Sequence, residues 1–219
     1  RRYNTFIKNY VPGPENRIFR VASGASEDDY EWTETLMTLG GRMDGLALDY
    51  YTLPSGSWRG PKGKSTGFDE AAWFATLKRT LRMKELIARH SEIMDKHDPE
   101  KKTALVVDEW GTWYDVEPGT NTGFLYQQNT LRDALVAALN LHLFQAHADR
   151  IKMANIAQII NVLQAMILTD KERMLVTPTY HVFVMFQPHQ DATSLPIELN
   201  TPDYARGEEK IPAVSASAS

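Results

Sequence analysis

The strongest constraint on the fold is a set of four short apolar runs. Each run ends at polar or acidic residues and is followed by a helix-like segment. Strands that alternate with helices are typical of βα units, in which a parallel sheet is covered on both faces and its strands are continuously apolar. The sequence therefore predicts an α/β fold with parallel strands over Arg17 to Ala22, Met43 to Tyr51, Thr103 to Glu109 and Arg150 to Asn155.

The segments between these runs carry helix signals. Ser26 and Asp29 have the spacing of a capping box that would open the first helix. A single long helix is expected from about Asp69 to Lys96, because its apolar residues recur every four positions. Thr130 and Asp133 have the same capping spacing and predict the start of a third helix.

The last third of the chain changes character. The apolar segment from Ile156 to Leu168 is predicted to be helical, whereas prolines and β-branched residues from Met174 onward predict extended structure. The end, Ile211 to Ser219, alternates like a strand that has lost its partner, although a flexible tail has the same composition. We expect an α/β part over residues 1–175, followed over 176–219 by a connection into a β-rich domain.

Composition excludes several classes of function. The 24 basic and 28 acidic residues give a net charge of -4 without a basic stripe, so nucleic acid is not an expected partner. No apolar run approaches the roughly 20 residues that span a bilayer, and Arg1 to Asn4 lack the apolar core of a signal peptide, so a soluble protein is expected. The absence of cysteine excludes disulfides and thiolate chemistry.

Four βα units fit either a doubly wound sheet or half of a (β/α)8 barrel. The segment after the first run has a single glycine, Gly24, where a dinucleotide-binding fold needs a glycine-rich fingerprint. Three of the predicted strands instead end near residues that can take part in catalysis, namely Asp49 with Tyr51, Asp108 with Glu109, and Asn155 with Gln158. Polar groups that converge from several strand ends favour a barrel, but a closed barrel needs eight strands.

Glu109 is the leading candidate for a catalytic carboxylate. It is followed by Trp110 and Trp113, and a carboxylate beside aromatic rings suits a sugar, whose C–H faces pack on aromatics while the carboxylate stabilises an oxocarbenium-like transition state. Capping of the next helix explains the same residue types. Asp49 is a second carboxylate at a strand end, either as an acid/base partner or as a hydrogen-bonding group around the site.

Other chemistries have weaker support. The four histidines from His142 to His189 lack metal-ligand spacing, so no metal and no cofactor are predicted. The loop from Leu53 to Gly67 has serines but no nucleophile elbow. The Lys and Arg residues from Arg59 to Lys64 are interpreted as a solvated loop, with phosphate binding as the alternative.

Five blocks that follow one another along the chain resemble the α-L-arabinofuranosidases of glycoside hydrolase family 51. They are RIFRVASGA at 17–25, DYEWTETLM at 29–37, VDEWG at 107–111, MANIAQ at 153–158 and TPTYHVF at 177–183. The resemblance implies strands five to eight of a TIM (β/α)8 barrel followed by the start of a C-terminal β-sandwich. It also implies a retaining glycosidase that removes terminal α-L-arabinofuranosyl groups from arabinoxylan or arabinan, and a homo-oligomer for the full-length protein.

The resemblance assigns roles by position. Glu109 resembles the family's nucleophile after strand seven, Tyr51 the active-site tyrosine after strand six, and Gln158 the residue after strand eight that helps to hold arabinose. Trp113 is expected in an aromatic wall. Asp49 stands where the family usually has a histidine, which replaces a hydrogen-bond donor by an acceptor and adds negative charge beside Glu109.

The family's general acid/base lies in an Asn-Glu-Pro motif after strand four, and no Asn-Glu pair occurs in this sequence. The chain is therefore expected to be a fragment that holds the nucleophile without the acid/base and is nearly inactive alone. Two alternatives remain: a carbohydrate-binding or interaction module that binds sugar without cleaving it, and an unrelated open α/β sheet in which Asp49 and Glu109 lie far apart.

Overall fold

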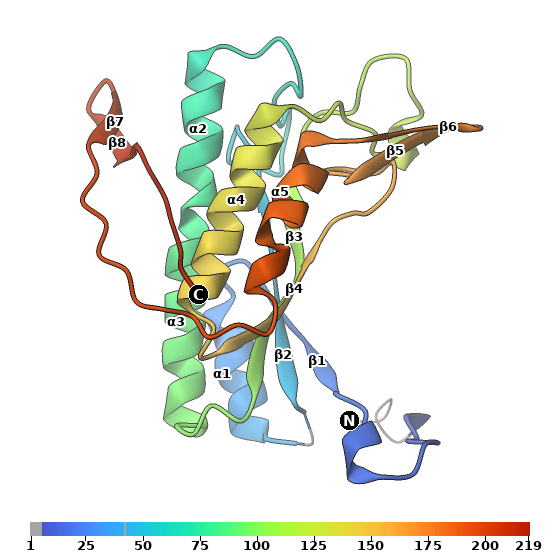
Figure 1. Cartoon of the computed structure of the whole chain (residues 1–219), viewed down its shortest axis with the longest axis vertical. Coiled ribbons are helices and arrows are strands. Elements are labelled where there is room, and N and C mark those ends of the chain that lie inside the picture. The colour runs from blue at the N-terminus through green and yellow to red at the C-terminus, as the bar shows by residue number, and fades with distance from the viewer. Residues whose placement is uncertain (1–5, 42) are drawn as a thin grey trace.

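The computed structural model describes residues 6–41 and 43–219; Arg1 to Asn4, which the sequence analysis compared with a signal peptide, lie outside the described residues. In chain order, the helices and strands are β1 (Val21–Ser26), α1 (Tyr30–Leu39), β2 (Gly45–Thr52), α2 (Glu70–Thr80), α3 (Arg82–His97), β3 (Ala104–Thr112), α4 (Leu131–Ala146), β4 (Ile151–Ile156), β5 (Ile167–Asp170), β6 (Arg173–Val176), α5 (Pro178–Phe186), β7 (Asp203–Arg206) and β8 (Glu209–Pro212), as Figure 1 shows.

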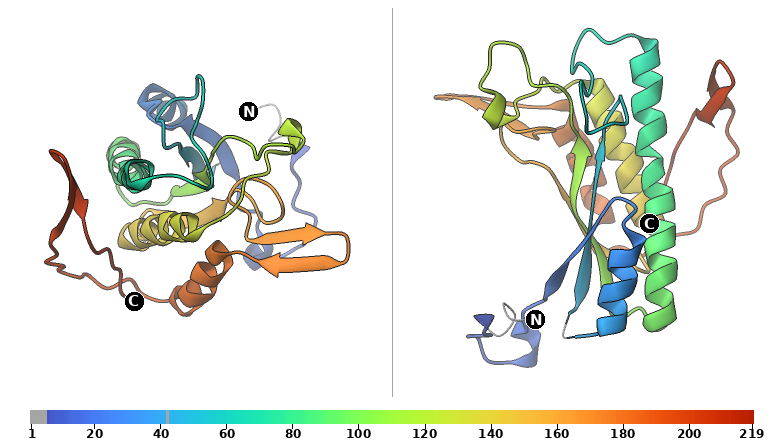
Figure 2. Two further views of the ribbon diagram at one scale, coloured as in Figure 1. Left: turned by 90° about the horizontal axis from the view of Figure 1, so that it is seen from above. Right: turned by 180° about the vertical axis from the view of Figure 1, so that it is seen from behind.

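The central sheet confirms the predicted parallel strands. Its order is β1-β2-β3-β4, and every neighbouring pair is parallel. The helices α1, α2, α3, α4 and α5 all lie to one side of this sheet, as the views from above and from behind show (Figure 2). The first strand begins at Val21 and not at Arg17, because the amide of Arg20 is bonded to a side-chain oxygen of Asp44 (2.9 Å) instead of to a neighbouring strand.

The hydrophobic core lies between the sheet and these helices. Leu48 on β2 and Val107 on β3 are fully buried, and they pack in one cluster with Leu86 and Ile87 of α3 and Phe144 of α4. Truncation of such a leucine to alanine costs about 2–5 kcal/mol, since the cavity left behind adds to the lost transfer free energy. Because successive strand residues point to opposite faces, the neighbours of these core residues face away from the helices.

Two details of the helices differ from the prediction. Asp29, and not Ser26, caps α1, since its side chain accepts a hydrogen bond from the amide of Trp32. The long helix expected from Asp69 to Lys96 is divided into α2 and α3 at Leu81. The hydroxyls of Thr76 and Thr80 donate to carbonyl oxygens four residues earlier, a bond that bends helices.

The predicted start of α4 is confirmed. Thr130 and Asp133 form a capping box, in which each side chain bonds to the backbone of the other residue. Asp133 is fully buried and also accepts a hydrogen bond from the hydroxyl of Thr112 at the end of β3 (2.7 Å). The cap therefore also joins the start of α4 to the end of a central strand.

The helix predicted from Ile156 to Leu168 is wrong. Between Ile156, the last residue of β4, and Ile167, the first of β5, the chain is a series of bends. Asn161 and Leu163 adopt left-handed backbone conformations that no α-helix accommodates. The apolar residues of this segment are nevertheless used for packing, because Leu163 and Ala157 bury against Tyr51. The apolar composition thus reflects burial of an irregular segment.

The extended structure predicted from Met174 is interrupted by α5. Pro178 stands in the first turn of that helix, where its missing N–H group is tolerated, and Val182 packs into the core. The strand predicted over Ile211 to Ser219 is present only to Pro212 as β8, which pairs with β7 in an antiparallel hairpin. In the described residues, no helix is long and apolar enough to cross a membrane.

Candidate active site

Asp49 and Glu109 are neighbours across β2 and β3, in the C-terminal half of each strand. They are register partners, because β3 carries one extra residue after Val106 that shifts the pairing. A bulge of this kind re-aims side chains and is common beside active sites. Without it, Asp108 and not Glu109 would stand opposite Asp49.

Tyr51 connects the two strands through its side chain. Its hydroxyl donates a 2.5 Å hydrogen bond to Oε1 of Glu109. Burial, together with this bond to a carboxylate, raises the pKa of Tyr51, so the phenol remains a proton donor at physiological pH. The structure therefore brings together two of the residues that the sequence placed in the site and orients the carboxylate of Glu109.

Two further carboxyl groups lie in the electrostatic surroundings of Glu109. Burial raises the pKa of Asp49, with added repulsion from Glu109 and Glu27, although Ser26 donates a 2.9 Å hydrogen bond to Asp49. The pKa of Asp108 is raised by burial first and then by the charges of Asp49 and Glu109. Like charges in a half-buried site favour the protonated form of one partner.

Aromatic rings lie beside Tyr51. The ring of Trp113 meets that of Tyr51 edge to face with centroids 5.0 Å apart, and Trp58 contacts both rings at 6.0 and 5.3 Å. The sequence analysis included Trp113 but missed Trp58, which it left within a solvated loop. A tryptophan in a loop rich in glycine, proline and serine directly after a strand with a candidate residue was the available signal.

Gln158 lies at the same edge of the sheet but outside this hydrogen-bonded group. It follows β4 and is exposed, one residue after Ala157, which is buried in the cluster that contains Tyr51. Gln164, six residues further along the chain, is fully buried and accepts a hydrogen bond from the amide of Thr112 (2.9 Å). The segment after β4 is thus attached to the end of β3.

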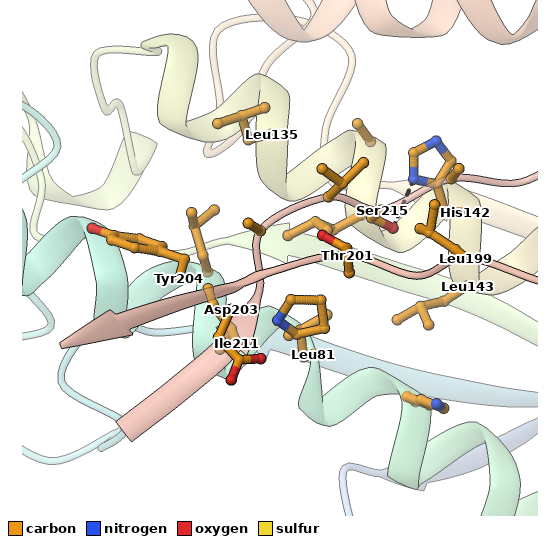
Figure 3. A pocket seen from close by; sticks show the side chains of 18 of the residues that line it. Leu81, Leu135, His142, Leu143, Leu199, Thr201, Asp203, Tyr204, Ile211 and Ser215 are labelled. Atoms are coloured by element: carbon orange, nitrogen blue, oxygen red, sulfur yellow. Dashed lines mark hydrogen bonds between the residues drawn. The ribbon is translucent and has the colours of Figure 1, made fainter. Parts of the chain in front are cut away.

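A cavity lies elsewhere in the described part of the chain. It has a volume of about 910 Å³ and lies between α2, α3, α4 and the C-terminal segment. Figure 3 shows its apolar lining, including Leu81 and Leu135, and the hydrogen bond between His142 and Ser215. This cavity is on the helical side, and the carboxylates of Asp49 and Glu109 do not line it.

A parallel α/β sheet that presents carboxylates and aromatic rings at the carboxyl ends of its strands has the construction of a glycoside hydrolase. Comparison with known proteins agrees with this class. Residues 108–218 match the family model for the C-terminal domain of α-L-arabinofuranosidases. The chain belongs to the α-L-arabinofuranosidases of glycoside hydrolase family 51.

Individual relatives give the same result. The chain is 53% identical to an intracellular exo-α-L-arabinofuranosidase of Bacteroides ovatus, over 100% of the chain and 42% of that protein. The crystal structure of the family 51 arabinofuranosidase from Xanthomonas axonopodis pv. citri is 59% identical and superposes with a TM-score of 0.93 over 99% of this chain and 43% of that one. The chain therefore spans less than half the length of these relatives.

A more distant structure supports the fold alone. The family 51 α-L-arabinofuranosidase of Bifidobacterium longum is 23% identical to this chain, with a TM-score of 0.72 over 90% of this chain and 41% of that protein.

Proposed function

We propose that the protein containing this chain is a retaining α-L-arabinofuranosidase and that Glu109 is its nucleophile. The observation that carries the proposal is the 2.5 Å hydrogen bond from the hydroxyl of Tyr51 to Glu109, at a strand end where Asp49 is the register partner. A donor on Oε1 holds the carboxylate in one orientation and leaves Oε2 for attack. Geometry of this kind is what a nucleophilic carboxylate needs.

The arrangement of the sheet supports strands five to eight of a (β/α)8 barrel. The strand order follows the chain order and the helices lie on one side, whereas a doubly wound sheet reverses its strand order and carries helices on both faces. In this proposal, residues 1–175 form the barrel part, and residues 176–219 lead into a β-sandwich. The face that carries Asp49 and Glu109 is then the interior of the barrel.

The proposed reaction is a double displacement. Glu109 attacks the anomeric carbon of a terminal α-L-arabinofuranosyl group while a carboxylic acid protonates the departing glycosidic oxygen, which gives a β-linked ester with the enzyme. The same acid, now a carboxylate, removes a proton from water, and the water displaces Glu109 to release arabinose with its original configuration. The substrates proposed are arabinoxylan, arabinan and their oligosaccharides.

The other residues have proposed binding and positioning roles. Tyr51 positions Glu109, Gln158 and Trp113 contact the sugar, and Asp49 sets the charge around the nucleophile. The general acid/base is assigned to a residue outside these 219, since the sequence has no Asn-Glu pair. Asp49 is the register partner of Glu109, and Asp108 precedes it in the sequence. Substituting each of these two residues on its own tests whether the acid/base indeed lies outside the 219 residues.

The experiment compares the full-length wild-type protein with Glu109→Ala on an aryl α-L-arabinofuranoside. We expect loss of turnover in the variant, and in the presence of azide a β-configured arabinofuranosyl azide, because the small anion enters the space left by the carboxylate and displaces the leaving group once. Glu92→Ala, an exposed glutamate on α3, is the matched control and should retain full activity. Residual activity of Glu109→Ala close to that of the wild type would overturn the assignment.

A second candidate function is sugar binding without hydrolysis. The observation that favours it is the register pairing of Asp49 with Glu109, because Asp49 adds negative charge beside the carboxylate that would have to attack the sugar. Calorimetric binding of an arabino-oligosaccharide by the full-length protein, without any turnover, would support this candidate over the first.

A further inference from the structure

We propose that Trp58 is a specificity-determining residue, which binds the sugar unit on the leaving-group side of the scissile bond, and that Glu27 is its positioning residue. The inference rests on the proposed function, because it takes Glu109 as the nucleophile that defines the scissile bond. It is based on the juxtaposition of Trp58 with Tyr51, Trp113 and Glu27.

Trp58 is the accessible member of the aromatic group. Its side chain is 47% exposed, whereas Tyr51 is 4% exposed and is committed to Glu109. The indole meets the ring of Tyr51 at an interplanar angle of 89° and that of Trp113 at 83°. Edge-to-face contacts of this kind fix the plane of the ring while leaving surface for a ligand.

Glu27 fixes the orientation of the indole. The Nε1 of Trp58 donates a 2.8 Å hydrogen bond to Oε1 of Glu27, and the other carboxylate oxygen of Glu27 is paired with Arg82 at 3.3 Å. The backbone amide of Glu27 donates to the carbonyl oxygen of Asp49 at 2.9 Å. Trp58 is therefore linked through Glu27 to the strand end that also carries the carboxyl group opposite Glu109.

The loop that carries Trp58 is attached to its surroundings on both sides. Arg79 of α2 donates to the carbonyl oxygen of Pro54 (3.1 Å), and the carboxylate of Asp115 accepts from the amide of Gly63 (3.1 Å). Arg132, which is fully buried, donates to the carbonyl oxygen of the residue after Gly63 (2.8 Å). A loop held in this way presents its tryptophan in a preorganised position, which reduces the entropy lost on binding.

The contact between the two rings assigns the ligand. The Tyr51 hydroxyl is bonded to Glu109, where the anomeric carbon reacts, and the indole of Trp58 meets the Tyr51 ring edge to face with centroids 6.0 Å apart. A neutral sugar ring, with its apolar C–H face on the indole and its hydroxyls toward water, is the chemical class that such a surface binds. Trp58 thus distinguishes substrates by the group attached to the arabinofuranosyl residue.

The experiment uses the full-length protein with two substrates, an α-1,5-linked arabinotriose and methyl α-L-arabinofuranoside, which has no leaving-group sugar. We expect Trp58→Ala to lower kcat/KM for the trisaccharide about tenfold more than for the methyl glycoside, mainly through KM. Trp32→Ala is the matched control, because Trp32 is 44% exposed and its indole nitrogen bonds to a backbone oxygen of Ser23 on β1. It should leave both values unchanged.

Glu27 supplies a second comparison. Glu27→Ala should raise KM for the trisaccharide, whereas Glu27→Gln, whose amide oxygen still accepts from the indole, should restore most of it. Thermal unfolding of each variant shows whether a loss of activity comes from misfolding. If Trp58→Ala misfolds, Trp58→Phe, which keeps an aromatic ring, is measured in its place.

Equal losses on the two substrates, or an unchanged KM for the trisaccharide, would overturn the assignment of Trp58. A wild-type protein that hydrolyses neither substrate would contradict the proposed function instead. In that case calorimetric binding of the trisaccharide still tests Trp58, since Trp58→Ala should weaken binding about tenfold and Trp32→Ala should not.

Discussion

The hydroxyl of Tyr51 on β2 donates a 2.5 Å hydrogen bond to the carboxylate of Glu109 on β3. The two residues are diagonal neighbours in the sheet, because Asp49 is the register partner of Glu109 and Gly111 that of Tyr51. The raised pKa of the phenol, caused first by burial, keeps its proton available to the carboxylate. This hydrogen bond between two neighbouring strands holds the carboxylate of Glu109 in one orientation.

Tyr51→Phe removes this bond while keeping the ring. We expect kcat/KM of the full-length protein to fall about 10- to 100-fold, since a hydrogen bond to a charged group contributes about 1.5–3 kcal/mol. Steady-state kinetics on an aryl α-L-arabinofuranoside measure the change. Tyr126→Phe, in the loop after β3, is the control, and an equal loss there would contradict a specific role of Tyr51.

Asp49→Asn should change the pH dependence of stability. The pKa of Asp49 in the folded state is raised above the unfolded value of about 3.9, first by burial. Between these two pKa values the folded state binds more protons than the unfolded state. The stability of the wild type therefore falls as pH rises through this range. The difference in unfolding free energy, variant minus wild type, should therefore increase between pH 4 and pH 7. Urea unfolding of the 219-residue chain at several pH values measures this difference.

Asp98→Asn is the control of opposite sign. Burial acts to raise the pKa of Asp98, but the amide of Thr103 and the guanidinium of Arg150 outweigh it and lower the pKa. The stability that Asp98 contributes is present above the unfolded pKa and is lost as pH falls, so Asp98→Asn should be most destabilising at neutral pH. Parallel pH profiles for the two variants would contradict the opposite environments of these carboxyl groups.

Arg132→Met should destabilise the chain by about 2 to 4 kcal/mol. The guanidinium is fully buried between the rings of Phe68 and Tyr114, at 3.7 and 4.2 Å from their centroids, and methionine fills the space without the charge. Chemical denaturation measures the loss. Arg173→Met removes an exposed ion pair with Asp170 and should change stability by less than about 0.5 kcal/mol, so equal effects would contradict the buried role.

The 219-residue chain alone should not turn over an aryl α-L-arabinofuranoside, because the proposed mechanism needs an acid/base from outside it. The assay compares the purified chain with the full-length protein at equal molar concentration. Turnover by the chain that is abolished by Glu109→Ala would show that one of its own residues is the acid/base, and Asp49→Asn would then identify whether Asp49 supplies the proton.

Several elements were predictable because their signals are local. The strands β2 and β3 begin with continuous apolar runs, and the capping box of Thr130 and Asp133 depends only on two side chains three residues apart. Tyr51 and Trp113 were placed in the site by resemblance to the family, and the structure puts their rings 5.0 Å apart. Local features of this kind can be predicted without knowing any contact between residues far apart in the sequence.

Other elements depended on contacts far along the chain. The segment from Ile156 to Leu168 is apolar because Leu163 packs on Tyr51, which an apolar run alone does not distinguish from a helix. Ser26 has the spacing of a helix cap, but its hydroxyl donates to Asp49, and Asp29 caps α1 instead. Trp58 was overlooked because its partners, Glu27 and Trp113, lie on other loops.

The sequence by itself determined the α/β class, the order of strands and helices, and the residue types of a sugar site. Apolar periodicity and side-chain chemistry are local properties that can be read without knowing the tertiary contacts. Only the tertiary structure decided that Glu109, and not Asp108, stands opposite Asp49. That choice depends on one extra residue in β3, and the register of two strands is fixed by packing across the sheet.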